Sequence, residues 1–145
     1  MRKLLFLTVC LGLAAPFGAA AQSSGDIEGI GNLAGAIMAC GAHKPLYQFE
    51  EILSRYFSNT SPNQAAEEAL MRRYATAKVS TYMIQRNRSK QECPQTVSDF
   101  TRMDIFKFEL YSDGSLKTPD GKYLFPRGQK KLAADAVKIY PRKKR

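Results

Sequence analysis

The sequence predicts a mostly α-helical, α+β protein: a compact bundle of about four to five helices, with a small antiparallel β-meander near residues 105–125 and one disulfide. Residues 61–87 form the longest run with helical periodicity, and two cysteines lie on either side of it. After residue 105 the apolar positions repeat every second residue, which is typical of a strand. We expect a signal peptide over residues 1–21, a single helical domain over 22–140 and a basic tail over 141–145.

The first residues have the composition of an export signal. Arg2 and Lys3 precede an apolar run, and small residues end at Ala21 before Gln22. The apolar run is far shorter than the roughly 20 residues that span a bilayer. We therefore expect Sec-type export, cleavage near Ala21, a periplasmic or secreted protein, and no transmembrane segment in the mature chain. An alternative is a lipobox that ends at Cys10, which would make the protein a lipoprotein.

Cleavage at this site would remove Cys10 and leave Cys40 and Cys93. An even number of cysteines in an exported chain favours a disulfide, and two cysteines allow one intramolecular pairing. Closing so long a loop stabilises a domain by roughly 4 kcal/mol on the loop-entropy account. The sequence therefore predicts a Cys40–Cys93 bridge around the long helical run.

Two helices are expected before that run. Residues 26–41 share an apolar face, and Gly31, Gly35 and Ala39 form a row of small residues that permits close helix packing. Residues 29–42 carry no charge, and we interpret them as part of a buried core helix. The alternative, a membrane-inserting segment, is disfavoured by its length and its glycine content. Residues 45–57 form the second, amphipathic helix.

The long run begins with a capping pattern. Ser61 can cap the first free amides, Pro62 suits the first helical position, and Gln64 completes the S-x-x-Q pattern. The face expected to be buried is rich in small residues, so that a neighbouring helix can approach closely. Its members are Ala66, Leu70, Tyr74, Ala77, Thr81 and Ile84.

The segment after Cys93 changes its period. A short helix is expected over 93–103. Strands are expected over 106–111, 116–118 and 123–125, with turns at 112–114 and 118–121. A continuous helix to Leu110 fits the same apolar positions and stays open as an alternative. A last short helix is expected between Gly128 and Pro141, with Lys130, Lys131 and Lys138 off its apolar face.

No catalytic motif is found, and we expect no catalytic residue, no metal site and no cofactor. The sequence has no G-x-S-x-G, P-loop, dinucleotide fingerprint, H-E-x-x-H, C-x-x-C or EF-hand pattern. Cys40 lies near the sole histidine, His43, but Cys93 is its expected partner, and one histidine is too few for a zinc site. Four glutamates could serve as glycosidase carboxylates, although we expect them on the solvated surface. They are Glu50, Glu51, Glu67 and Glu68.

Positive charge is concentrated at the C-terminal end. The chain has a formal net charge of +9, and residues 117–145 hold ten lysines and arginines against two aspartates. Residues 22–116 hold ten against eleven acidic residues. We expect the basic end to contact a polyanion: an anionic envelope component, namely lipopolysaccharide or anionic lipid, or an acidic protein. The expected contact residues are Lys130, Lys131, Lys138, Arg142, Lys143, Lys144 and Arg145.

Nucleic acid is not expected as a partner, because the sequence shows no basic-aromatic module and the expected compartment is wrong. The tail can also be explained as a solvated end that aids solubility. The leading hypothesis is a small, non-enzymatic accessory or binding protein of the bacterial cell envelope. One alternative is a secreted effector whose basic C-terminus is a transport or targeting signal, and a second is a small peptidoglycan-acting enzyme that uses a carboxylate.

Overall fold

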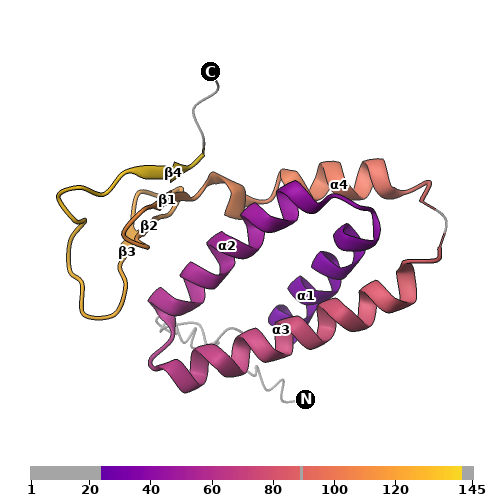
Figure 1. The fold of residues 1–145 in the computed structure, drawn as a ribbon, viewed down its shortest axis with the longest axis horizontal. Coiled ribbons are helices and arrows are strands. Elements are labelled where there is room, and N and C mark those ends of the chain that lie inside the picture. Colours follow the sequence, from indigo (N-terminus) through magenta and orange to yellow (C-terminus); the bar gives the residue numbers. More distant parts are fainter. Residues whose placement is uncertain (1–23, 89, 142–145) are drawn as a thin grey trace, which may run out of the picture.

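The structure, a computed structural model, describes residues 24–88 and 90–141. The expected signal peptide and Arg142, Lys143, Lys144 and Arg145 lie outside the described residues. Helices and a small antiparallel sheet make up the described part (Figure 1), so the predicted fold class, mostly α with a β-meander and one disulfide, is confirmed. The elements are α1 (Ser24–Ala39), α2 (His43–Thr60), α3 (Gln64–Gln85), α4 (Cys93–Thr101), the 3-10 helix η1 (Asp104–Lys107), β1 (Glu109–Tyr111), β2 (Leu116–Lys117), β3 (Tyr123–Leu124) and β4 (Lys138–Tyr140).

The closest helix packing joins α1 to α3. A Cβ atom at Gly31 would lie 2.5 Å from the carbonyl oxygen of Tyr74, and one at Gly35 would lie under 3.0 Å from that of Lys78. The close helix packing predicted from the row of small residues is therefore found at Gly31 and Gly35, because only glycine lets the two backbones approach so closely. Since the contact advances along both helices together, α1 and α3 run in the same direction.

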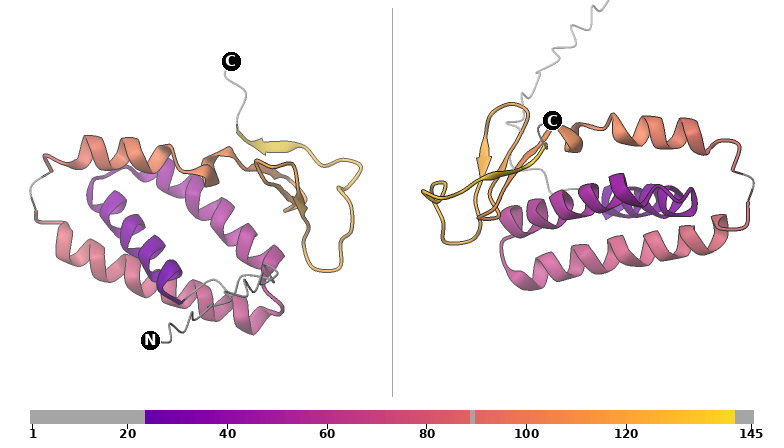
Figure 2. Two further views of the ribbon diagram at one scale, coloured as in Figure 1. Left: turned by 180° about the vertical axis from the view of Figure 1, so that it is seen from behind. Right: turned by 45° about the horizontal axis from the view of Figure 1, so that its top comes forward.

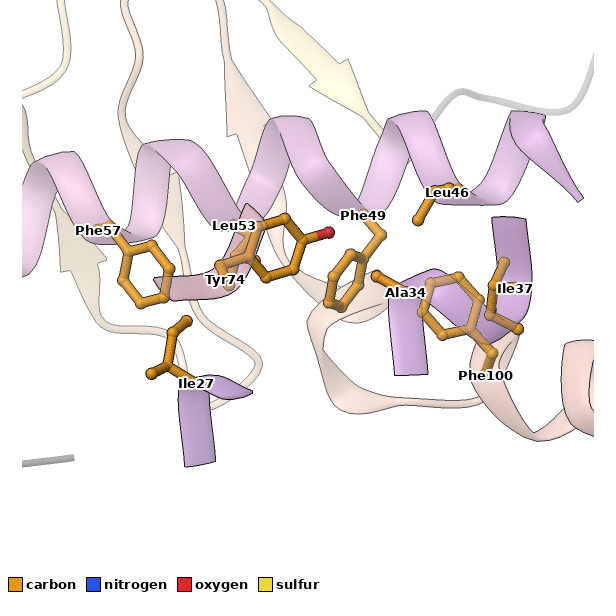
Figure 3. Packing of buried hydrophobic residues seen from close by; sticks show 9 residues of the cluster. All are labelled: Ile27, Ala34, Ile37, Leu46, Phe49, Leu53, Phe57, Tyr74 and Phe100. Carbon is orange, nitrogen blue, oxygen red and sulfur yellow. The ribbon is translucent and has the colours of Figure 1, made fainter. Parts of the chain in front are cut away.

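The main hydrophobic cluster lies between the four helices. In the right-hand view of Figure 2, α1 and α2 form a middle layer between α3 and α4. Phe49 of α2 and Phe100 of α4 meet with ring centroids 5.0 Å apart (Figure 3). The interpretation of residues 29–42 as part of a core helix is confirmed, since α1 contributes buried side chains to this cluster. The buried members are Ile27, Ala34, Ile37, Leu46, Phe49, Leu53, Phe57, Tyr74 and Phe100.

The start of α3 differs from the prediction. Its cap is Asn63, whose side chain accepts a hydrogen bond of 2.9 Å from the amide of Ala66, whereas Ser61 is the C-cap residue of α2. Asparagine caps a helix as well as serine does, so the helix can begin two positions later. Ile84 is 59% exposed, and its expected burial is wrong. The face of α3 that contacts the glycines of α1 runs from Tyr74 to Tyr82, and Ile84 lies beyond its end.

The predicted Cys40–Cys93 disulfide is confirmed, with a Cα–Cα distance of 5.5 Å. Cys40 lies in the turn between α1 and α2, which bends through Gly41 at a φ of +74°. Cys93 is the first residue of α4. Because α4 is short and follows a connection without regular structure, the bridge fixes the helix end that lies farthest from the sheet.

The sheet has the order β3-β2-β1-β4, and all of its pairs are antiparallel. Leu110 of β1 and Leu116 of β2 are opposite each other and pack against Ile52 of α2 in a second, smaller cluster. The predicted strand over 106–111 is shorter than expected: Phe106 belongs to η1, and β1 begins at Glu109 and ends at Tyr111. The alternative of a continuous helix to Leu110 is wrong, because α4 ends at Thr101.

The predicted last helix between Gly128 and Pro141 is wrong. This stretch forms turns and then β4, which pairs with β1 at the edge of the sheet. Ile139 packs against the second cluster, and Val137 accepts a backbone hydrogen bond of 2.9 Å from the amide of Ser112. The helical pattern of this segment is therefore overridden, because β4 pairs with the edge of β1, which is distant in sequence. Local periodicity does not report such long-range pairing.

Candidate anion-binding surface

A loop over residues 125–137 joins β3 to β4 and carries two of the predicted contact residues. Its anchor is Asp113, in the turn between β1 and β2. The carboxylate of Asp113 accepts hydrogen bonds from the amide of Ala133 (3.0 Å), the amide of Ser115 (2.9 Å) and Nε2 of Gln129 (2.6 Å). Partial burial raises the pKa of Asp113, but these hydrogen bonds outweigh it and hold the pKa below its usual value. The loop is therefore fixed to the hairpin at two separate residues.

The anchored loop presents Lys130 and Lys131 to solvent. Both side chains are exposed, and neither forms an ion pair with any residue in 24–88 or 90–141. Gln129 also donates a hydrogen bond of 2.7 Å to the carbonyl oxygen of Lys131, which fixes the backbone between the two lysines. These two predicted contact residues are therefore neighbours on the loop, and no acidic side chain of the described residues competes with a ligand for them.

Two other cations of this region have acidic partners within the protein. Arg127, at the start of the loop, forms an ion pair with Glu67 of α3. Lys138 lies on β4 and not on the expected helix, and its Nζ is 2.6 Å from Oε1 of Glu109. The hydrogen bond from Lys138, together with one from Tyr111, lowers the pKa of Glu109. The charge of Lys138 is thus partly neutralised, so this residue has less charge to offer a ligand than Lys130 and Lys131.

The described chain ends beside a groove between α2 and β4. His43, Lys44, Tyr47, Gln48, Tyr140 and Pro141 line this groove, which has a volume of about 700 Å³. Arg142, Lys143, Lys144 and Arg145 follow Pro141 in sequence, so the four-residue basic end starts from this side of the sheet. Their contacts with a ligand stay a prediction.

Sequence reasoning missed a row of side chains on the outer face of the sheet. Lys117 of β2 lies opposite Tyr123 of β3, with its Nζ 5.6 Å from the ring centroid. The ring of Tyr123 is stacked on that of Phe125 at 5.7 Å and lies 6.1 Å from that of Tyr111. We call Tyr111, Lys117, Tyr123 and Phe125 the sheet-face row. The alternation that predicted the strands could have indicated this row, because it places Tyr111 on the face opposite Leu110.

The four glutamates considered as glycosidase carboxylates have separate structural roles or lie on the surface. Glu50 accepts hydrogen bonds from the hydroxyl of Tyr74 (2.7 Å) and from Nζ of Lys78 (2.5 Å). Burial, and then the hydrogen bond to Glu50, raises the pKa of Tyr74. Glu67 is paired with Arg127, whereas Glu51 and Glu68 are exposed. The contacts of Glu50 and Glu67 join helices and loops, which is a structural role.

The cysteine–histidine pair is likewise not available as a nucleophile and base. Cys40 is bonded to Cys93 and has no thiolate to offer, and His43 is exposed at the first residue of α2. Among the described residues, no group of three His, Cys, Asp or Glu side chains is placed to hold a metal ion. The helices of the described part include none that has the length and apolar character needed to cross a membrane.

Comparisons with protein-family models, with curated proteins and with solved structures found no match to this chain. The inference of function therefore rests on the contacts, exposure and charge of the protein's own residues. Two features are not explained by core packing: the sheet-face row, and the two lysines of the anchored loop that form no ion pair with the described residues.

Proposed function

We propose that the protein is an exported, non-enzymatic binding protein of the bacterial cell envelope that holds a phosphate-bearing component through its C-terminal region. Lipopolysaccharide and anionic phospholipid share the phosphate chemistry that this region would recognise. One observation carries the proposal: Lys130 and Lys131, adjacent in sequence and exposed, form no ion pair with the described residues and lie on a loop that Asp113 fixes to the sheet.

Electrostatics explains why these residues suit such a ligand. A basic residue near an anionic membrane surface contributes about 1 kcal/mol to binding, and salt screens that attraction within about 10 Å at 0.1 M. Because hydrogen bonds already fix the backbone of the loop, a ligand that binds the two lysines orders their side chains but needs to order little further backbone. Lys138 and Arg127 contribute less in this proposal, because a ligand would compete with Glu109 and Glu67 for them.

Two features support the exported location. Residues 1–21 have the composition of a cleavable signal, and the Cys40–Cys93 bridge is of a kind that persists in oxidising compartments. N-terminal analysis of protein recovered from the envelope should begin within a residue or two of Gln22. A lipid-modified Cys10 would contradict this part of the proposal.

The test compares the loop lysines with matched charges on the helical part. Purified mature protein is sedimented with vesicles of phosphatidylglycerol or of phosphatidylcholine, and with lipopolysaccharide, from 20 to 500 mM salt. The loop variant is Lys130→Gln/Lys131→Gln. The control, Arg86→Gln/Lys90→Gln, also removes two positive charges at exposed positions that form no ion pair with described residues.

We expect binding to anionic but not to phosphatidylcholine vesicles, and a steep loss of binding as salt rises. At the lowest salt the loop variant should lose about thirtyfold in affinity, because two residues that contribute about 1 kcal/mol each are removed, and the control should lose less than twofold. Deleting residues 142–145 should weaken binding further and leave the melting temperature almost unchanged. Salt-insensitive binding, or equal losses in the loop variant and the control, would contradict the proposal.

A further inference from the structure

We infer that the outer face of the sheet binds the sugar portion of the anionic envelope component, with the sheet-face row as its contact surface. This inference rests on the proposed function and narrows its ligand to a phosphorylated or carboxylated saccharide. The row lies on the same small sheet to which Asp113 fixes the loop that carries Lys130 and Lys131.

The strand register brings the members of the row together. Glu109 lies opposite Lys117, and Lys117 lies opposite Tyr123, so three adjacent strands place three functional groups side by side. Their neighbours along the strands, Leu110, Leu116 and Leu124, pack on the opposite face towards α2. Because side chains alternate between the two faces of a strand, the row points away from the helices.

Core packing does not account for the aromatic members of the row. Tyr111, Tyr123 and Phe125 belong to neither hydrophobic cluster, and all three stay partly exposed. The parallel rings of Tyr123 and Phe125, tilted by only 4° from each other, form one continuous apolar block on the sheet surface. Partly exposed aromatic side chains with nearby polar groups are characteristic of binding surfaces.

The polar groups around this block favour a saccharide. The hydroxyl of Tyr111 donates a hydrogen bond of 2.8 Å to Glu109, and Lys117 lies over the ring of Tyr123. A sugar presents a flat C–H face to an aromatic ring and hydroxyl groups to a carboxylate and an ammonium group. An acyl chain would displace water from these polar groups and offer no hydrogen bonds in return, at a cost in free energy.

The same carboxylate disfavours single-stranded nucleic acid. Proteins that bind it combine stacking aromatic rings with a groove that is positive along its length. Here Glu109 lies between Lys117 and Lys138 on the sheet, where it would repel a phosphate backbone. We therefore commit to the saccharide and treat nucleic acid as an outcome of the test.

The experiment uses the mature protein and three probes. The first is de-acylated lipopolysaccharide, which keeps the phosphorylated sugars and lacks the acyl chains; the second is phosphatidylglycerol vesicles; the third is oligo(dT). Affinities are measured for wild type, for Tyr123→Leu/Phe125→Leu and for Lys117→Gln, and circular dichroism and melting temperature establish that each variant is folded. Tyr123→Phe is the matched control that keeps the ring.

We expect Tyr123→Leu/Phe125→Leu to weaken binding of the de-acylated probe by about fivefold to tenfold. Its binding to vesicles should change less than twofold, and Tyr123→Phe should stay close to wild type. Lys117→Gln, an exchange of a partly exposed residue that does not threaten the fold, should weaken saccharide binding by about threefold.

Different results identify which proposal is wrong. If vesicles bind and the de-acylated probe does not, the saccharide inference is overturned while the proposed function stands. If neither anionic probe binds, the proposed function itself is wrong. Tighter binding of oligo(dT) than of the saccharide, or equal losses on vesicles and saccharide in the leucine variant, would also overturn the inference.

Discussion

The helical body, residues 24–107, and the sheet region, residues 108–141, are held together by different kinds of interaction. In the body, two glycines let α1 lie against α3, buried side chains from four helices share one cluster, and a disulfide fixes α4. In the sheet region, the apolar cluster is small, and Asp113 connects the turns by hydrogen bonds. Asn59 of α2 donates two further hydrogen bonds to this region, to the carbonyl oxygens of Gly114 and Leu124. The body is stabilised by close packing, and the sheet region largely by hydrogen bonds and ion pairs.

This difference in packing explains how the sheet region can carry the excess of positive charge found in residues 117–145. A polar surface region that is anchored at a few points can change its surface residues without disturbing the main core. We therefore expect substitutions in the body to cost stability, and substitutions in the sheet region to change local order and ligand binding.

The largest effect should come from the disulfide. Replacing Cys40 and Cys93 by serine opens a loop with a sequence separation of 53 residues. On the loop-entropy account this lowers the free energy of unfolding by about 4 kcal/mol. Urea denaturation measures the loss, and reduction of the wild-type protein should reproduce it. An unchanged midpoint after reduction would show that packing alone fixes α4.

The glycine contact between α1 and α3 comes next. Gly35→Leu should lower the free energy of unfolding by roughly 3 kcal/mol, because its side chain would collide with the backbone of α3. Gly29 is the matched control: it lies on the same helix with nothing within 4 Å, and Gly29→Ala should stabilise the protein by about 0.5–1 kcal/mol. Similar effects at the two glycines would contradict the close contact between α1 and α3.

The hydrogen bond from the buried Tyr74 to Glu50 is a polar contact within the body. Tyr74→Phe should cost about 1.5–3 kcal/mol, because a buried bond to a carboxylate is lost. Since the pKa of Tyr74 is raised in the fold, its contribution is complete below the unfolded tyrosine pKa of about 10 and is lost as pH rises above it.

The free energy of unfolding, measured by denaturation between pH 7 and 11, therefore distinguishes the contribution of Tyr74 from those of other residues. Tyr74→Phe should show a shallower alkaline loss of stability than wild type. Tyr111→Phe serves as the control, because Tyr111 also has a raised pKa but lies on the sheet surface. If only Tyr111→Phe reduced the loss of stability at alkaline pH, the pH dependence would come from the sheet region and not from Tyr74.

Asp113 should affect the sheet region and leave the body intact. Asp113→Ala removes the hydrogen bonds to Gln129, Ser115 and Ala133 and should cost about 1–2 kcal/mol. Hydrogen exchange should quicken in residues 109–141 and stay unchanged in α1 and α3. Asp135→Ala, on the same loop and exposed, is the control and should have little effect.

The pH dependence of the Asp113 anchor has the opposite sign to that of Tyr74. Because the pKa of Asp113 is lowered in the fold, its stabilisation is present above the unfolded aspartate pKa of about 3.9 and is lost as pH falls below it. Protection of the loop should therefore decrease on acidification. If acidification still lowered the protection of the loop in Asp113→Ala, the pH dependence would come from other carboxylates.

The smallest effect is expected where the two regions are joined by an ion pair. Glu67→Gln removes the partner of Arg127, and exposed pairs of this kind contribute at most about 1 kcal/mol. Thermal unfolding of Glu67→Gln should lie close to that of Glu51→Gln, which changes an exposed and unpaired carboxylate on α2. A large loss for Glu67→Gln alone would mean that the two regions depend on each other for stability.

Much of the helical body is readable from local sequence. The spacing of apolar residues indicates α1 to α4, the glycine row indicates a close helix contact, and the even cysteine count indicates the bridge. These features are readable because a helix fixes its neighbours by local geometry, so a periodic pattern determines which residues share a face. Even here, the choice of Asn63 over Ser61 as the cap depended on where α2 ends.

The sheet region was decided by tertiary structure. Residues 128–140 have a helical pattern, yet the free edge of β1, the carboxylate of Asp113 and the contact of Ile139 with the second cluster hold them as turns and a strand. The same long-range pairing assembled the sheet-face row and gave Lys138 a partner in Glu109. By itself, the sequence determined where the charge is and where α1 to α4 form, because both depend on local sequence. Which lysines form ion pairs within the described residues, and which aromatic rings lie next to one another, depends on strand register, which is set only when distant segments meet.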